Sequence, residues 1–209
     1  MPIVIVVAQQ KGGAGKTTLA ANLAAAFARE RKVALLDADP QRTLSHWHSL
    51  RAANRDAKAS IAFLQITAWR LGIELDRITR MHDLVVIDTP PEIATDARQA
   101  VRAADLVLIP LQPSPPDLWA AEGTLRLAAG EHRPARLVLN RAPAASRLRT
   151  AIEAEIAARE LPALTAVLGN RTAFAAAFAR GLSVLESAPR SQAAAELTAL
   201  AQEIAALAE

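Results

Sequence analysis

The chain alternates between short apolar segments and longer segments in which apolar residues recur at helical spacing. The apolar segments have the length and composition of buried strands, and we predict strands at 3–8, 33–37, 61–66, 84–88, 106–110 and 137–140, with a weaker candidate at 164–168. Helical patterns lie between them, at 17–30, 41–54, 68–80, 95–103, 117–129, 146–159, 172–180 and 191–208. We therefore expect an α/β fold of three layers, with a doubly wound, mostly parallel sheet.

The most informative segment lies between the first predicted strand and the first predicted helix. In a parallel sheet, ligands bind beyond the carboxyl ends of the strands, and this segment is rich in glycine there. Such a loop can wrap a phosphate with its backbone N–H groups at the start of a helix. The expected nucleotide-binding residues of the loop are Gly12, Gly13, Ala14, Gly15, Lys16, Thr17 and Thr18. The segment predicts a P-loop NTPase-like site for a nucleoside triphosphate, in which Lys16 reaches the phosphates.

The phosphate loop departs from the usual pattern at its first residues. Gln10 stands where glycine is usual, and Lys11 adds a second lysine. This loop resembles the deviant Walker A loop of the ParA/MinD family of ATPases. The resemblance implies that Lys11 reaches across an ATP-sandwich homodimer to the partner's phosphates, and that Lys11, Lys16 and an aspartate take part in slow, partner-stimulated hydrolysis of ATP.

Acidic residues follow two other predicted strands. Asp88 ends a buried apolar run and resembles a Walker B carboxylate, so we expect it to hold Mg²⁺ together with the hydroxyl of Thr17. The family's second acidic motif resembles residues 37–41 of this chain. That resemblance implies that Asp37 lies near the metal and that Asp39 positions the attacking water.

Two further segments resemble parts of the family's nucleotide site. Asn140 and Arg141 follow the sixth predicted strand, and Pro113 lies in a proline-rich loop after the fifth. The resemblance implies that these residues form the adenine pocket, in which an amide can both donate to and accept from a base edge. Residues 89–91 resemble a switch that responds to the γ-phosphate.

Composition limits the setting and the organisation of the protein. The 209 residues suit a single domain, 1–209, and include no cysteine, which excludes disulfides and Cys-ligated clusters. The apolar N-terminal run is too short to span a bilayer and leads directly into the phosphate loop, so we expect a cytoplasmic protein. The loop begins so early that we expect no N-terminal helix-turn-helix domain, as in small ParA-type members.

The charge of the C-terminal half is consistent with an acidic partner, and equally with arginines that are simply solvated on helix surfaces. Residues 133–190 contain nine arginines and four glutamates. ParA-like members bind DNA non-specifically as ATP dimers, which implies nucleoid association and makes Arg149, Arg171 and Arg180 candidate phosphate contacts. The tail from residue 191 carries glutamates and no basic residue, so direct binding to an anionic membrane is not expected.

The resemblance thus implies a partition or positioning ATPase with a ParB-like or other cargo-adaptor partner. Its cargo is a plasmid, a chromosome or a protein assembly. Two alternatives stay open at this point. One is a MinD-like or other regulatory positioning ATPase that does not act on DNA, and the other is a metabolic ATP-dependent synthetase with a related loop.

Overall fold

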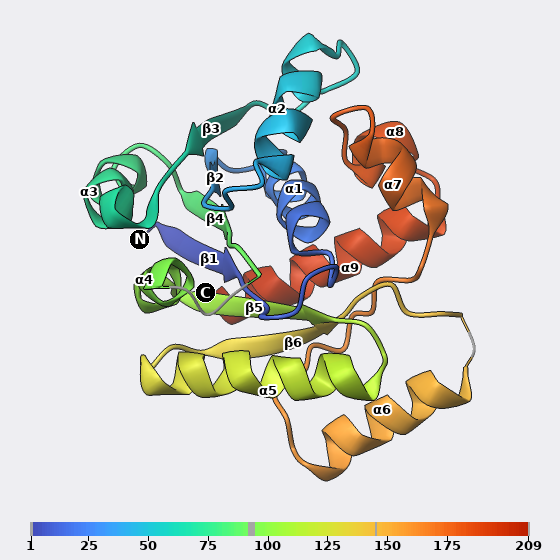
Figure 1. The fold of residues 1–209 in the computed structure, drawn as a ribbon. Helices are drawn as coiled ribbons and strands as arrows, with labels where there is room; N and C mark the ends of the chain where they lie inside the picture. Colours follow the sequence, from blue (N-terminus) through green and yellow to red (C-terminus); the bar gives the residue numbers. More distant parts are fainter. Residues whose placement is uncertain (1, 92–94, 145, 209) are drawn as a thin grey trace.

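A six-stranded sheet forms the centre of the protein. The computed structural model describes residues 2–91, 95–144 and 146–208. All strand pairs of the sheet are parallel, and the strands lie in the order β3-β2-β4-β1-β5-β6 (Figure 1). The strands are β1 (Ile3–Val7), β2 (Val33–Asp37), β3 (Ile61–Gln65), β4 (Leu84–Asp88), β5 (Leu106–Leu111) and β6 (Ala135–Leu139). This arrangement confirms the predicted fold class.

Helices cover both faces of the sheet. They are α1 (Lys16–Phe27), α2 (Thr43–Ala53), α3 (Ala68–Thr79), α4 (Thr95–Ala103), α5 (Pro115–Gly130), α6 (Arg147–Ala158), α7 (Thr172–Phe178), α8 (Val184–Ser187) and α9 (Gln192–Ala208). No helix among the residues described is both long and apolar enough to cross a membrane.

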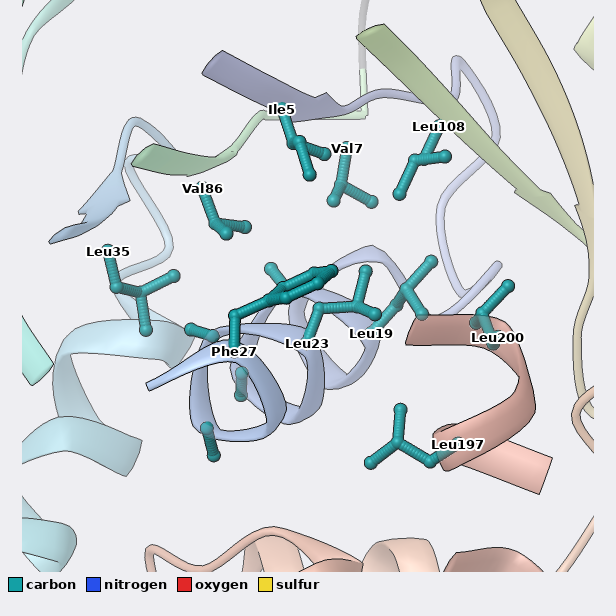
Figure 2. Close-up of a cluster of buried hydrophobic side chains, with 14 of the residues drawn as sticks. Ile5, Val7, Leu19, Leu23, Phe27, Leu35, Val86, Leu108, Leu197 and Leu200 are labelled. Carbon is teal, nitrogen blue, oxygen red and sulfur yellow. The ribbon is translucent and has the colours of Figure 1, made fainter. Parts of the chain in front are cut away.

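Two hydrophobic cores hold the three layers together. On one face, side chains of α1 and α9 pack against β1, β2, β4 and β5, as Figure 2 shows for Leu23, Leu197 and Val86 among others. On the other face, α3, α4, α5 and α6 supply residues such as Leu75 and Ile156. Full burial of one leucine or isoleucine side chain stabilises the fold by about 1.5–3 kcal/mol, which explains why almost wholly apolar strands occupy the middle layer.

The strand order places the functional segments at one edge. β1 lies between β4 and β5, so the order reverses beside it and a crevice opens at its carboxyl end. Val7, the last residue of β1, pairs in register with Asp88, and Asp88 in turn pairs with Asp37. The phosphate loop and two acidic residues therefore leave neighbouring strands at the same level.

The weak seventh strand is not formed. Residues 162–170 run beside β6 and exchange scattered backbone hydrogen bonds with it, such as Leu164 N to Leu137 O and Leu168 N to Leu139 O. The segment is otherwise irregular and forms isolated β-bridges at Ala163 and Gly169. A proline at 162 cannot donate to a ladder, and Glu203 of α9 accepts from the N–H groups of Thr165 and Ala166, the second of which a continuous strand would direct toward β6.

Candidate functional site

The phosphate loop turns sharply between β1 and α1. Gly13 and Gly15 have φ values of 81° and 91°, in the left-handed region that favours glycine, and Gly15 caps the N-terminus of α1. A Cβ atom on Gly15 would lie 2.4 Å from Nδ2 of Asn140. Glycine is required at this position both for its backbone angle and for the close approach of Asn140.

Side chains that directly follow β5 and β6 hold the carbonyl groups of the loop. Asn140 Nδ2 donates to the Ala14 carbonyl at 2.8 Å, and the Gly13 carbonyl accepts from Gln112 Nε2 at 3.2 Å and from the Arg141 guanidinium at 3.3 Å. Arg141 itself has a φ of 52°, an uncommon backbone conformation for a side chain of this size. Fixing the carbonyls leaves the loop's N–H groups and the start of α1 to face an anion.

Lys16 lies at the base of this loop with 6% of its surface exposed. Burial lowers the pKa of its ammonium group, and the negative charges of Asp88 and Asp39 oppose this effect. A desolvated cation beside a phosphate-sized loop attracts a phosphate more strongly than a solvated one would. The position agrees with the role expected of Lys16.

Asp88 is fully buried, and neither of its carboxylate oxygens has a well-formed hydrogen bond within the described chain. Burial raises the pKa of this carboxyl group to about 8, against the opposing effects of the Thr17 hydroxyl and the Lys16 ammonium group. A buried carboxylate that has only the Thr17 hydroxyl and the Lys16 ammonium group nearby to offset its charge fits a hard divalent cation that prefers oxygen ligands. Thr17 and Asp88 are therefore chemically suited to hold Mg²⁺, and their role as its ligands stays a prediction.

Asp37 has several partners within its own chain. Its carboxylate accepts from Ser45 N at 2.8 Å, from Ser45 Oγ at 2.6 Å and from Asp39 N at 3.1 Å. Asp39 accepts from Gln41 N at 2.9 Å and is only partly buried. The contacts of Asp37 fix the start of α2, so its closeness to a metal stays a prediction, as does the role of Asp39 in positioning water.

Lys11 forms an ion pair with Asp117 of the same chain. The lysine side chain is 41% exposed, whereas Asp117, in the first turn of α5, is buried. Asp117 also accepts from the hydroxyl of Ser114, the residue that caps α5. The additional lysine is thus held at the edge of its own site, where it is accessible from outside.

A cavity of about 350 Å³ adjoins the phosphate loop. Asn140 and Arg141 line it, as the sequence predicted for a base pocket, together with Arg171 and Phe174. Pro113, expected in the same pocket, is buried elsewhere and does not line this cavity. Residues of the segment 168–175 complete the lining of this cavity, and the place of Pro113 in an adenine pocket stays a prediction.

The three candidate DNA contacts do not form one patch and are all paired. Arg149 bonds to Glu153 at 2.8 Å on α6, Arg171 to Glu196 at 2.6 Å, and Arg180 to Asp56 at 2.8 Å. In Figure 1, α6 lies far from α7, which Arg171 and Arg180 flank. Their contact with DNA stays a prediction, and it requires these arginines to exchange a carboxylate for a phosphate.

The sequence did not single out several side chains of the site. The expected site residues did not include Ser45, Gln112 or Asp117, because each of them acts by holding another residue of the site. The pattern Ser-x-x-Asp at 114–117 was visible as a helix start, and α5 does begin there. In the expected switch segment, Thr89 donates to the Val7 carbonyl at 3.0 Å. Its response to nucleotide stays a prediction.

Comparisons with known proteins agree with this geometry. Residues 5–184 match the family model described as the CobQ/CobB/MinD/ParA nucleotide binding domain. The chain is 33% identical to maintenance of carboxysome distribution protein A of Halothiobacillus neapolitanus over 92% of this chain and 91% of that protein. It is 39% identical to the protein of the same name from Gloeobacter kilaueensis, over 88% and 85%. MinD of Pyrococcus horikoshii, solved with Mg-ADP, superimposes with a TM-score of 0.81 at 20% identity, covering 100% of this chain and 98% of that one.

Proposed function

Because the chain belongs to the CobQ/CobB/MinD/ParA nucleotide-binding family, we propose that it is a Mg²⁺-dependent ATPase that positions a cellular cargo. The observation that carries the proposal is the pair of lysines in the phosphate loop, Lys16 inside the site and Lys11 at its rim. Two relatives that align over most of this chain carry the name of a carboxysome distribution protein. A protein assembly such as a carboxysome is therefore our first candidate for the cargo.

The chemistry follows from the position of each group. Thr17 and Asp88 hold the metal ion, which when bound neutralises charge on the β- and γ-phosphates. Lys16 and the loop N–H groups hold the phosphate oxygens, and Asp39 orients a water molecule toward the γ-phosphate. One positioned carboxylate on the rim is enough for slow hydrolysis. A partner that completes or stabilises this arrangement accelerates it.

Lys11 makes ATP binding and dimerisation interdependent. In the free protein Lys11 is paired with Asp117, and in the ATP state it leaves that carboxylate for the phosphates in the second subunit. Two such contacts related by a two-fold axis close the sandwich. Hydrolysis removes the γ-phosphate, and each lysine returns to Asp117 of its own chain.

The dimer is also our candidate for the form that binds DNA. Doubling the arginine-rich surface in one particle multiplies weak phosphate contacts, which explains why binding would require ATP. Arg149 and Arg180 supply such contacts by exchanging Glu153 and Asp56 for DNA phosphates. The protein then resides in the cytoplasm on the nucleoid, and a ParB-like or other adaptor connects it to its cargo.

The size of the particle in solution tests the dimer directly. We would measure the mass of the wild-type protein by analytical ultracentrifugation without nucleotide, with ADP, and with ATP and Mg²⁺. We expect a dimer only with ATP. The Lys11→Ala variant should bind ATP and stay monomeric, whereas the control Lys32→Ala, which removes an exposed lysine outside the site, should dimerise normally. An ATP dimer of the Lys11 variant would refute the assigned role of Lys11.

A further inference from the structure

The wall of the cavity beside the phosphate loop depends on helix α9. Residues 168–175 form this wall, and they follow the irregular segment that runs beside β6. Glu196 of α9 accepts from Gly169 N at 3.0 Å and from the Arg171 guanidinium at 2.6 Å and 2.9 Å. One carboxylate therefore holds both the backbone and a charged side chain of the wall.

These contacts fix the plane of the Arg171 guanidinium. Two of its nitrogens donate to Glu196, and a Cβ on Gly169 would lie 2.9 Å from its Nε, so the group lies directly against the backbone of residue 169. Burial raises the pKa of Glu196, but the hydrogen bonds from Arg171, Gly169 N and Gln192 and the charge of Arg171 together outweigh burial and lower the pKa, which keeps the carboxylate ionised. The third guanidinium nitrogen, Nη1, has no hydrogen bond among the described residues, and it remains available to a ligand together with any part of the group turned away from residue 169.

We propose that Arg171 contacts the nucleoside of the bound nucleotide and that Glu196 is its positioning residue. This inference rests on the proposed binding of ATP. The cavity lies beside Gly15 and Thr18, where a nucleoside extends from phosphates held by the loop. A planar cation can stack on the face of a base or donate to ribose hydroxyls. Arg141 and Asn140 border the same cavity from the phosphate-loop side.

This assignment differs from the contact with DNA that the sequence suggested for Arg171. The guanidinium is already held by two charge-assisted bonds to a carboxylate with a side chain only 13% exposed. Transfer to a DNA phosphate would leave Glu196 ionised and poorly solvated, which is costly. Arg180 is paired with Asp56, whose side chain is 64% exposed, so that exchange costs little.

Helix α9 also offers a matched control. Glu203 accepts from Thr165 N at 2.7 Å and from Ala166 N at 2.8 Å, so it holds the same segment by the same kind of contact. Neither of those residues lines the cavity. Replacing Glu203 tests the general role of α9 in holding the segment, and replacing Glu196 tests the position of Arg171.

Comparing the affinities for ATP and for inorganic tripolyphosphate separates the contribution of the nucleoside to binding from that of the phosphates. By titration calorimetry, we expect Arg171→Ala and Glu196→Gln to weaken ATP binding by about tenfold, the factor for one lost contact of about 1.4 kcal/mol. Tripolyphosphate, which engages only the phosphate loop, should bind both variants as it binds the wild type. Glu203→Gln should bind ATP normally. Arg171→Lys, which keeps the charge without the planar fork, should lose most of the same affinity.

The outcomes distinguish this inference from the proposed function. If the wild-type protein binds ATP and either Arg171→Lys or Glu196→Gln binds it equally well, the inference about Arg171 and Glu196 is refuted while the proposed binding of ATP stands. Wild-type protein that binds neither ligand would refute ATP binding itself. At saturating ATP, Arg171→Ala should bind duplex DNA like the wild type. Loss of DNA binding with unchanged ATP affinity would return Arg171 to the DNA contacts.

Discussion

The buried ion pair between Arg51 and Glu186 gives a sharp prediction about stability. Their side chains are 5% and 7% exposed, and the guanidinium donates to the carboxylate at 2.7 Å and 2.8 Å. Glu186 also accepts from the backbone N–H groups of Lys58 and Ser183. The pair connects the end of α2 to the capping box of α8. Replacing Glu186 by glutamine removes the charge and leaves Arg51 buried without a counter-ion.

The pKa shift of Glu186 and the typical cost of breaking a buried ion pair indicate a similar loss of folding free energy. Burial raises the pKa of Glu186, but the bonds from Arg51 and the backbone outweigh it and lower the value to about 2, from 4.5. This shift corresponds to about 3 kcal/mol of folding free energy. Breaking a buried pair by removing one partner costs about 3–5 kcal/mol. We therefore expect Glu186→Gln to lower the free energy of unfolding at pH 7 by about 3 kcal/mol.

The sign of the pH dependence follows from the lowered pKa. In the unfolded chain the carboxyl group gains its proton near pH 4.5, whereas in the fold it stays ionised down to about pH 2. The stabilisation is complete above the unfolded value and is lost as the pH falls toward 2. The difference in stability between wild type and variant should therefore shrink from pH 5 downward.

Urea unfolding of wild type and Glu186→Gln at pH 7 and at several lower pH values measures the loss of stability at pH 7 and its decrease at lower pH. The control Glu30→Gln changes an exposed carboxylate and should leave stability nearly unchanged. A loss below 1 kcal/mol at pH 7, or a difference that does not vary with pH, would show that this ion pair does not contribute as argued.

Two further predictions concern the nucleotide site. The raised pKa of Asp88 means that the fold favours its protonated form, so between about pH 4 and 8 this group should reduce stability by about 1.4 kcal/mol per unit as the pH rises. In urea unfolding at pH 6 and 8 without metal or nucleotide, the free energy of unfolding of Asp88→Asn should not show this decrease with pH. An equal pH dependence in wild type and variant would contradict the raised pKa of Asp88. Asp117→Asn keeps an acceptor for Ser114 but releases Lys11 from its ion pair. It should lower the ATP concentration for half-maximal dimerisation several-fold, as measured by ultracentrifugation, and an unchanged or higher concentration would show that Asp117 does not restrain Lys11.

The sequence predicted the six strands well because nearly every residue in them is apolar, which leaves little ambiguity in a three-layer α/β protein. It also placed the phosphate loop and Asp88 correctly, since their spacing is local. The seventh strand, expected at 164–168, was wrong because Glu203, far along the chain, accepts from the backbone N–H groups of Thr165 and Ala166 in the middle of it. Short helix α8 was not predicted, as its single turn offers no periodicity.

Contacts between distant residues were beyond the reach of local patterns. Lys11 and Asp117 lie 106 positions apart, and neither segment alone indicates their pairing. Arg171 illustrates the same limit for function. As a sequence feature it was one arginine in a basic region, whereas the fold places it in the wall of a cavity beside Gly15.

The most direct test of an ATP-controlled, DNA-bound positioning ATPase is its affinity for non-specific double-stranded DNA without nucleotide, with ADP, and with ATP and Mg²⁺, each at two salt concentrations. Control of DNA binding by ATP predicts binding only in the ATP state, and weaker binding at the higher salt concentration because arginine–phosphate contacts release counter-ions. Absence of binding in every state would contradict it and favour a positioning ATPase that does not act on DNA. Equal binding in all three states would contradict control by ATP.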